Sequence, residues 1–235
     1  MSMKLRAGAV AALVLALTSC SSSPGPQPTE APSAAAAAPS AGPNGVADLA
    51  PTEILAKTEA AMQAATSVTI DLDDGLGESV IRIGPDGSSG TLGGDLGATE
   101  IVEVAETVYV KGEGLAEQLG VAAPADKWVA IPPDDPLAAQ FTLFDSPSDF
   151  VASSGLLTAE TKMTKVGPRD IAGVEAVGLR SKDRTLWVAT SGEPYLVAVT
   201  PPSGEPGSAV LRDFNVPVNV VAPPADQVVD VTTLR

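Results

Sequence analysis

The hydrophobic pattern of the chain changes its period near residue 66. Over residues 51–65 apolar side chains recur at helical spacing, and residues 48–53 offer an N-terminal cap with a proline and an acidic residue in the first turn. Over residues 67–72 apolar and polar residues alternate strictly, as in a strand that is buried on one face. The sequence therefore predicts one opening helix followed directly by a strand.

Short strand-like runs occupy most of the remaining chain. They cover residues 79–83, 90–92, 100–104, 107–111, 127–131, 160–166, 174–180, 185–190, 195–200 and 208–214. Glycine-rich turns and short connections separate most of them, whereas parallel strands need crossovers of a dozen residues or more. Residues 115–120, 137–144 and 148–157 are weakly helical. The predicted fold class is α+β, with a single large curved antiparallel β-sheet of about ten strands and helices packed on one face.

The first 20 residues carry the features of an export signal. Lys4 and Arg6 precede an uncharged apolar run of 11 residues, which is too short for a membrane-spanning helix. The run ends in Leu17-Thr18-Ser19-Cys20, and Cys20 is the only cysteine of the chain. Small residues before a cysteine form a lipobox that resembles the bacterial lipoprotein signal. An ordinary secretion signal with a chance cysteine at its end is the alternative.

This resemblance implies a lipid-anchored protein. Residues 1–19 would be the lipoprotein signal peptide, cleavage would precede Cys20, and a diacylglycerol would be attached to its sulfur. The new N-terminus would also be acylated, typically with palmitate. The implied location is the extracytoplasmic face of the cell membrane, with part of the protein released.

A low-complexity segment follows the cysteine. Of the 25 residues at 21–45, 21 are Pro, Ala, Ser or Gly, so the segment has almost nothing to bury. We expect residues 20–45 to be the lipidated cysteine and a disordered tether. Residues 46–235 are then long enough to form a single domain.

Composition excludes several kinds of chemistry. The chain has no histidine and one cysteine, which removes imidazole-based catalysis, internal disulfides and thiolate clusters. Its net charge is −15, and loss of Lys4 and Arg6 with the signal leaves 12 basic and 29 acidic residues, or about −17. Such a field repels nucleic acids. We expect no nucleic-acid partner, no cofactor and no metal.

Candidate reactive motifs are weak. The acidic stretch 71–78 has Gly75 where a calcium loop needs a ligand, and residues 84–87 form a hairpin turn rather than a phosphate cradle. Asp134 and Asp135 are adjacent in a proline-bounded loop, which does not favour paired acid and base roles. Half of the 12 basic residues that follow the signal lie close together in the sequence. These residues are Lys162, Lys165, Arg169, Arg180, Lys182 and Arg184. They are interpreted either as solvated side chains or as a patch that binds an acidic headgroup.

Several motifs in order give the chain a family resemblance. After the lipobox and the leader come Ala-Thr-Ser-Val-Thr at 65–69, Glu-Thr-Val-Tyr-Val-Lys-Gly at 106–112 and Lys-Trp-Val at 127–129. Leu-Trp-Val-Ala-Thr-Ser-Gly-Glu-Pro-Tyr-Leu-Val-Ala at 186–198 and Asp-Phe-Asn-Val-Pro-Val at 213–218 complete the series. The chain resembles the LppX/LprA/LprF/LprG group of actinobacterial lipoproteins, which share the LolA/LolB-like fold. The resemblance implies a half-barrel with helices across its concave face, an apolar cavity that holds acylated lipids or glycolipids in several members, and no enzymatic activity.

The alternating apolar positions supply a candidate lining for such a cavity, and three phenylalanines lie where a lid would sit. The candidates are Val68, Ile70, Leu72, Val102, Val104, Val108, Val110, Phe141, Phe144, Phe150, Val177, Leu179, Leu186, Val188, Val197 and Val199. A filled core needs the same pattern, so periodicity alone does not separate the two. One hypothesis is a non-enzymatic envelope lipoprotein that binds an amphiphilic or lipid ligand and carries or presents it. The other is a structural or accessory envelope lipoprotein with a closed core, no ligand and an unidentified protein partner.

Overall fold

The structure is a computed structural model that describes residues 42–75, 77–157, 162–201 and 207–235, all within one compact unit, Ser40–Arg235. Its strands are β1 (Val68–Asp73), β2 (Glu78–Gly84), β3 (Gly87–Leu92), β4 (Thr99–Val104), β5 (Thr107–Gly112), β6 (Trp128–Ile131), β7 (Thr164–Ile171), β8 (Val174–Arg180), β9 (Thr185–Ala189), β10 (Leu196–Thr200), β11 (Ser208–Arg212) and β12 (Val228–Asp230). Its α-helices are α1 (Pro51–Ala64), α2 (Leu115–Leu119), α3 (Ala138–Phe141) and α4 (Pro147–Ser153). Short 3-10 helices cover Val46–Asp48, Ala225–Gln227 and Val231–Leu234.

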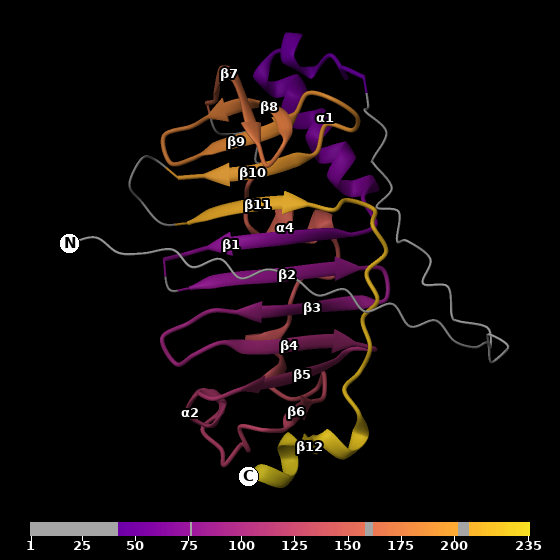
Figure 1. The fold of residues 1–235 in the computed structure, drawn as a ribbon, viewed down its shortest axis with the longest axis vertical. Coiled ribbons are helices and arrows are strands. Elements are labelled where there is room, and N and C mark those ends of the chain that lie inside the picture. Colours follow the sequence, from indigo (N-terminus) through magenta and orange to yellow (C-terminus); the bar gives the residue numbers. More distant parts are fainter. Residues whose placement is uncertain (1–41, 76, 158–161, 202–206) are drawn as a thin grey trace, which may run out of the picture. The chain divides into compact units, whose positions relative to one another are not determined.

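The strands form one open sheet (Figure 1). Its 12 strands follow the order β12-β6-β5-β4-β3-β2-β1-β11-β10-β9-β8-β7. The predicted α+β class with a single large sheet is confirmed, with 12 strands in place of about ten. The sheet is mixed rather than purely antiparallel, because β12 pairs in parallel with β6. That strand was missed because three residues are too few to display an alternating pattern.

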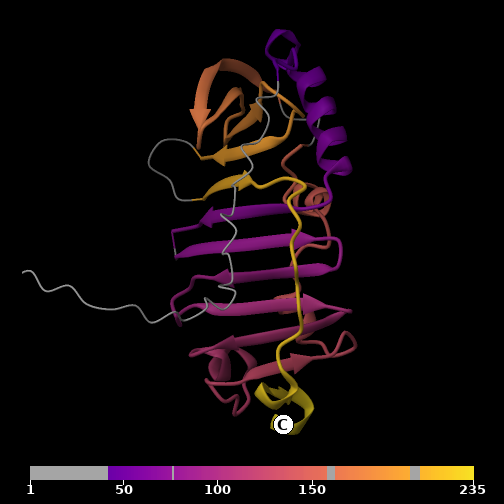
Figure 2. The ribbon, with the colours of Figure 1, turned by 45° about the vertical axis from the view of Figure 1, so that its right-hand side comes forward.

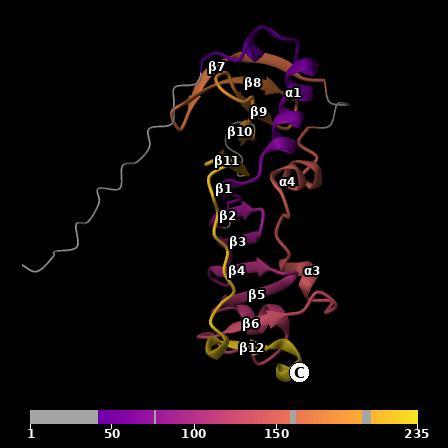
Figure 3. The ribbon, with the colours of Figure 1, turned by 90° about the vertical axis from the view of Figure 1, so that its right-hand side faces the viewer.

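Helices α1, α3 and α4 cover one face of the sheet (Figure 3). Figure 3 shows α1, α3 and α4 on the same side, with strands β7 to β9 curling toward α1. Between helices and sheet lies the main hydrophobic core, to which Ile54 and Met62 of α1 and Ile70 of β1 contribute fully buried side chains. The prediction that helices pack on a single face is confirmed for these three helices.

A C-terminal segment, residues 213–224, crosses the opposite face of the sheet from β11 toward β12 (Figure 2). The Ser67 hydroxyl donates a hydrogen bond to the Val216 carbonyl at 2.7 Å. Gly84 of β2 lets the segment lie close, because a Cβ atom at this position would stand 2.9 Å from Cβ of Val218. This segment covers the β1–β6 part of that face, while a second, smaller hydrophobic cluster around Trp187 occupies the β7–β10 part.

The end of the chain is held by an ion pair to a buried carboxylate. Arg235 Nη2 donates to Asp135 Oδ1 at 2.8 Å, and the Asp135 side chain is only 5% exposed. This hydrogen bond, together with one from the Leu137 backbone N–H, holds the pKa of Asp135 below its usual value of 3.8. An acid with a lowered folded-state pKa contributes stability above its unfolded pKa and loses it as the pH falls through the folded value.

Arg235→Met is therefore expected to lower the free energy of unfolding near pH 7, because it removes the main cause of the lowered pKa. The difference from the parent should shrink as the pH falls below about 3.8, where Asp135 becomes protonated in both proteins. Urea denaturation between about pH 2 and 7 checks this. Arg82→Met is the matched control, since Arg82 is exposed and forms no ion pair within the described residues. A difference that is independent of pH would contradict the prediction.

Candidate functional site

Most of the predicted lining residues lie on the helix-covered face of the sheet or in the helices above it. Those in the main core or packed against it are Val68, Ile70, Leu72, Val108, Val110, Phe141, Phe144, Phe150, Val177, Leu179, Leu186, Val188 and Val199. The period-two alternation thus selects one face in most strands.

In β4 the structure selects the other set of alternate positions. Ile101 lies opposite Val110 and Glu103 lies opposite Val108, so Ile101 and Glu103 share the helix-covered face. Val102 and Val104 belong to the opposite alternation, and both are half-buried. In β4 the main core therefore takes Ile101 and not Val102 or Val104, although Val104 borders the hollow beside α3 that is described below.

Val197 is also displaced from its expected face. The register between β9 and β10 shifts between Leu196 and Ala198, which is the sign of a bulge. Leu196 and Val199 contact the main core, whereas Val197 and Ala198 belong to the smaller cluster on the opposite face. Strict alternation through this strand therefore failed at a single residue.

Several core residues on the helix-covered face were not among the candidates. They are Ile81, Ile83, Ile101, Val129, Ile131, Leu196 and Leu211. For Ile81 and Ile83 the signal was present, because the sequence Ser-Val-Ile-Arg-Ile at 79–83 alternates in the same way as β1.

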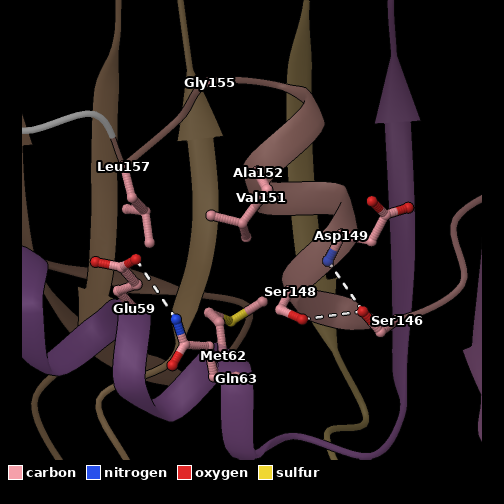
Figure 4. A pocket seen from close by; sticks show the side chains of 10 residues that line it. All are labelled: Glu59, Met62, Gln63, Ser146, Ser148, Asp149, Val151, Ala152, Gly155 and Leu157. Carbon is pink, nitrogen blue, oxygen red and sulfur yellow. Dashed lines mark hydrogen bonds between the residues drawn. The ribbon is translucent and has the colours of Figure 1, made fainter.

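A hollow of about 650 Å³ lies between α1 and α4, and we call it the α1–α4 hollow (Figure 4). Its lining residues are Glu59, Met62, Gln63, Ser146, Ser148, Asp149, Val151, Ala152, Gly155 and Leu157. The Ser146 hydroxyl accepts the Asp149 N–H at 3.0 Å and so caps the first turn of α4. Met62, Val151 and Leu157 give the hollow an apolar part, and the carboxylates and hydroxyls give it a polar part.

A second hollow of about 440 Å³ lies between α4 and the sheet, at the ends of β1, β10 and β11. We call it the α4–sheet hollow. Its apolar lining includes Leu72, Phe150 and Val199, which the sequence had selected, together with Leu156 and Ala209. Asp73, Asp74, Asp183 and Arg184 also line it. The hollow thus combines an apolar lining with several charged residues.

Three phenylalanines, Phe141, Phe144 and Phe150, attach residues 141–150 to the core above the sheet. Phe144 and Phe150 meet edge to face, with ring centroids 5.1 Å apart and an interplanar angle of 82°. Phe141 and Phe150 are buried at 7% and 5% exposure. All three rings belong to the main core or pack against it, and Phe150 is the ring that borders the α4–sheet hollow.

A third hollow of about 610 Å³ lies beside α3, at the turns that join β2 to β3 and β4 to β5, and contains Glu103. The Glu103 carboxylate accepts the Leu143 backbone N–H at 2.9 Å, which fixes the segment between α3 and α4 to the sheet. Burial raises the pKa of Glu103 above its usual 4.5, the Leu143 hydrogen bond opposes this, and the charge of Asp145 adds to it. Val104, Val108 and Phe144 also line this hollow.

Glu103→Gln is expected to flatten the pH dependence of stability between about pH 4.5 and 7.5. An acid with a raised folded-state pKa holds its proton more tightly in the folded state, so stability falls as the pH rises through that pKa. Glutamine keeps an acceptor for Leu143 and removes the charge. Because the group is partly solvated, the expected gain at pH 7.5 is only about 0.5 kcal/mol. Denaturation at both pH values checks this, with the exposed Glu106→Gln as control; an equal effect of both substitutions would contradict it.

The remaining candidates for chemistry occupy structural positions. Asp71 pairs with Arg212 at 2.7 Å, and Asp73 Oδ1 accepts the Gly75 N–H at 3.1 Å, so the acidic stretch forms a strand end and a turn. Within the described residues no group of three or more His, Cys, Asp or Glu is placed to hold a metal ion. In the same part of the chain no helix is long and apolar enough to cross a bilayer. Cys20 and the signal lie outside the described residues.

The fold is that of an open, curved sheet whose one face is covered by helices. It is similar to that of the lipoprotein LprF from Mycobacterium bovis, with a TM-score of 0.52 and 15% identity, over 77% of this chain and 98% of that one. The lipoprotein LppX from Mycobacterium tuberculosis aligns with a TM-score of 0.47 and 18% identity, over 73% of this chain and all of that one (100%). No family model and no curated protein matches the sequence. The resemblance noted in the sequence is thus confirmed at the level of the fold, through LprF.

Proposed function

We propose that the protein is a non-enzymatic envelope lipoprotein, anchored through Cys20, that shields the acyl chains of an amphiphilic ligand beside α4. The observation that carries this proposal is the α4–sheet hollow, where Leu72, Phe150, Leu156, Val199 and Ala209 form an apolar lining next to charged residues. Its volume of about 440 Å³ and that of the α1–α4 hollow, about 650 Å³, fall within the usual range for ligand pockets, about 300–1,000 Å³. The fold shared with LprF and the family resemblance support it.

The driving force would be burial of hydrocarbon. Each buried methylene group contributes about 0.8 kcal/mol, so a few carbons in the hollow give measurable affinity without any chemical step. Helix α4 is the element that both hollows share, since Val151 and Ala152 face one of them and Phe150 and Ser154 line the other. Ligand chains would therefore pack against opposite sides of this helix. From such a site the ligand would be carried or presented in the cell envelope.

Photocrosslinking tests the proposal. The full chain is purified from membranes in detergent and incubated with a diacylglycerol that bears a diazirine in one acyl chain. Crosslinks are expected in the peptides that contain residues 150–157 and 199–212. Mass spectrometry of lipids extracted from the same preparation would then identify any natural ligand.

Filling each hollow from an exposed position distinguishes them. Ser154→Phe should reduce labelling through the α4–sheet hollow about fivefold, and Ala152→Trp should do the same for the α1–α4 hollow. Ala56→Trp is the matched control, because Ala56 is exposed on α1 and lines neither hollow. Labelling spread evenly over the surface, or unchanged by both substitutions, would favour the alternative of an accessory lipoprotein with a closed core.

A further inference from the structure

Four basic side chains surround one hollow on the face of the sheet opposite the helices. Arg169 of β7, Arg180 of β8, and Lys182 and Arg184 of the following turn line a space of about 430 Å³. We call it the basic hollow. No acidic residue of the described chain lines it, although 29 acidic residues give the protein its negative charge. Arg180 is the last residue of β8, and Lys182 and Arg184 lie in the turn that joins it to β9.

These cations differ from others in the chain by their partners. Arg212 and Arg235 form ion pairs with carboxylates, and Lys127 and Lys165 donate to backbone carbonyls. Within the described residues, none of the four cations of the basic hollow forms an ion pair with a carboxylate. Arg180 Nε donates to Thr185 Oγ1 at 3.5 Å, and this is the hydrogen bond that the four side chains make to a neighbour within the described residues. The remaining guanidinium and ammonium N–H groups are available to an external acceptor.

The floor of the basic hollow is a tightly packed tryptophan. Trp187 lies opposite Gly178 in the neighbouring strand, and a Cβ atom at Gly178 would stand 3.0 Å from Cζ3 of the ring. The ring is held by a hydrogen bond from its Nε1 to Thr200 Oγ1 at 3.0 Å, and Arg169 lies over it at 5.5 Å from the centroid. The bond leaves the Thr200 hydroxyl proton to be donated into the hollow.

We propose that the basic hollow is a binding site for a phosphate group. Like charges around one small space repel each other, and an oxyanion there would relieve that repulsion. Planar guanidinium groups match phosphate oxygens with paired N–H donors, which a hydroxyl from Thr200 would supplement. The phosphate belongs to a small soluble molecule or to the headgroup of a phospholipid.

Arg184 lies where the basic hollow meets the α4–sheet hollow. Arg184 and Pro201 line both the basic hollow and the α4–sheet hollow, so the two spaces meet at this edge of the sheet. A phospholipid with its chains beside α4 would be able to place its phosphate at Arg184. Phosphate binding itself does not depend on the lipid proposal, because the other three cations, Arg169, Arg180 and Lys182, line only the basic hollow.

Equilibrium dialysis of the full chain in a neutral detergent tests the proposal at low ionic strength. The probes are inorganic phosphate, glycerol 3-phosphate and dihexanoyl phosphatidic acid. Equal affinities would indicate a soluble phosphate as the ligand. Tighter binding of the phosphatidic acid, with the excess lost in Ser154→Phe, would indicate a phospholipid headgroup. Quenching or enhancement of Trp187 fluorescence in a Trp128→Phe background locates the site, since the chain has only two tryptophans.

Substitutions at the β8–β9 turn supply the decisive comparison. Arg180→Gln and Arg184→Gln are each expected to weaken binding of all three probes about tenfold, which is the loss of one charge-assisted contact. Arg82→Gln is the matched control, because Arg82 is exposed on β2 outside the basic hollow. Absence of binding, or an equal loss in Arg82→Gln, would overturn the proposal. Diacylglycerol labelling should be unchanged in Arg180→Gln, so failure of one proposal is distinguishable from failure of the other.

Discussion

Gly87→Ala is expected to destabilise the protein by about 3 kcal/mol or more, out of a typical total of about 5–15 kcal/mol. Gly87 opens β3 with φ of +145°, a conformation that residues with side chains rarely adopt. A Cβ atom there would stand 2.2 Å from the carbonyl oxygen of Glu103 in β4. The clash is with backbone, so no side-chain rotation relieves it.

Urea denaturation followed by circular dichroism measures this effect. Gly167→Ala is the control, because a Cβ atom at Gly167 meets nothing within 4 Å and its φ is not positive. We expect that substitution to change the free energy of unfolding by no more than about 0.5 kcal/mol. Similar urea midpoints for the two variants would contradict the prediction, because they would show that β3 and β4 move apart at this turn without loss of stability.

The same turn illustrates what the sequence predicts and what it leaves open. The run Gly84-Pro85-Asp86-Gly87 predicts a hairpin connection from local preferences alone, and β2 and β3 are joined there. The need for glycine at 87 comes from β4, which approaches from the other side. Such an approach depends on the order of strands in the sheet, and no local pattern encodes it.

The alternation of apolar and polar residues predicted most strands of the sheet. It did not predict the buried face of a strand in which both sets of alternate positions contain apolar residues. In β1 only one set of alternate positions is apolar, and Val68 and Ile70 are both fully buried. In β4 both sets contain apolar residues, and cross-strand register with β5 decides between them. Glu103 is tolerated on the helix-covered face because its carboxylate reaches the Leu143 N–H. Sequence alone does not reveal a partner 40 positions away.

The edge strand β7 was placed too early. The sequence predicts a strand over 160–166, of which residues 160 and 161 lie outside the described part of the chain, and the structure places β7 at Thr164–Ile171. Beyond residue 166 the strand continues through Gly167 and Pro168, and β7 is the last strand of the sheet. An edge strand accommodates proline, and the register shift between Val166 and Arg169 absorbs this pair. This extension brings Arg169 to the basic hollow.

The places of the hollows in the fold could not be predicted from the sequence. The apolar positions of the sheet were identified, but most of them are packed against helices, and only Leu72 and Val199 of the sheet candidates border the α4–sheet hollow. Which of them remain open depends on where α4 lies. That position is set by its contacts with α1 and by the Phe144–Phe150 pair, which are properties of the folded chain.

Cys20→Ser is expected to abolish retention in the membrane fraction. Serine offers no sulfur for a diacylglycerol, and stable anchoring requires two or more acyl chains at about 0.8 kcal/mol per methylene group. The charge of about −17 after the signal gives no attraction to an anionic bilayer. In the described part of the chain no helix is suited to spanning a membrane. We therefore expect membrane association to depend on the proposed lipid at Cys20.

Fractionation followed by intact-mass measurement tests this, with one precaution. A chain that keeps residues 1–19 would be held by their apolar run, so Cys20→Ser is best combined with an ordinary cleavable secretion signal. Ser22→Ala with the native signal is the matched control and should stay in the membrane with the added mass of the lipid. Membrane retention of the Cys20→Ser chain after signal cleavage would show that another surface binds the bilayer. In that case the basic hollow, with Arg180 and Arg184, would be the first surface to test against phospholipid headgroups.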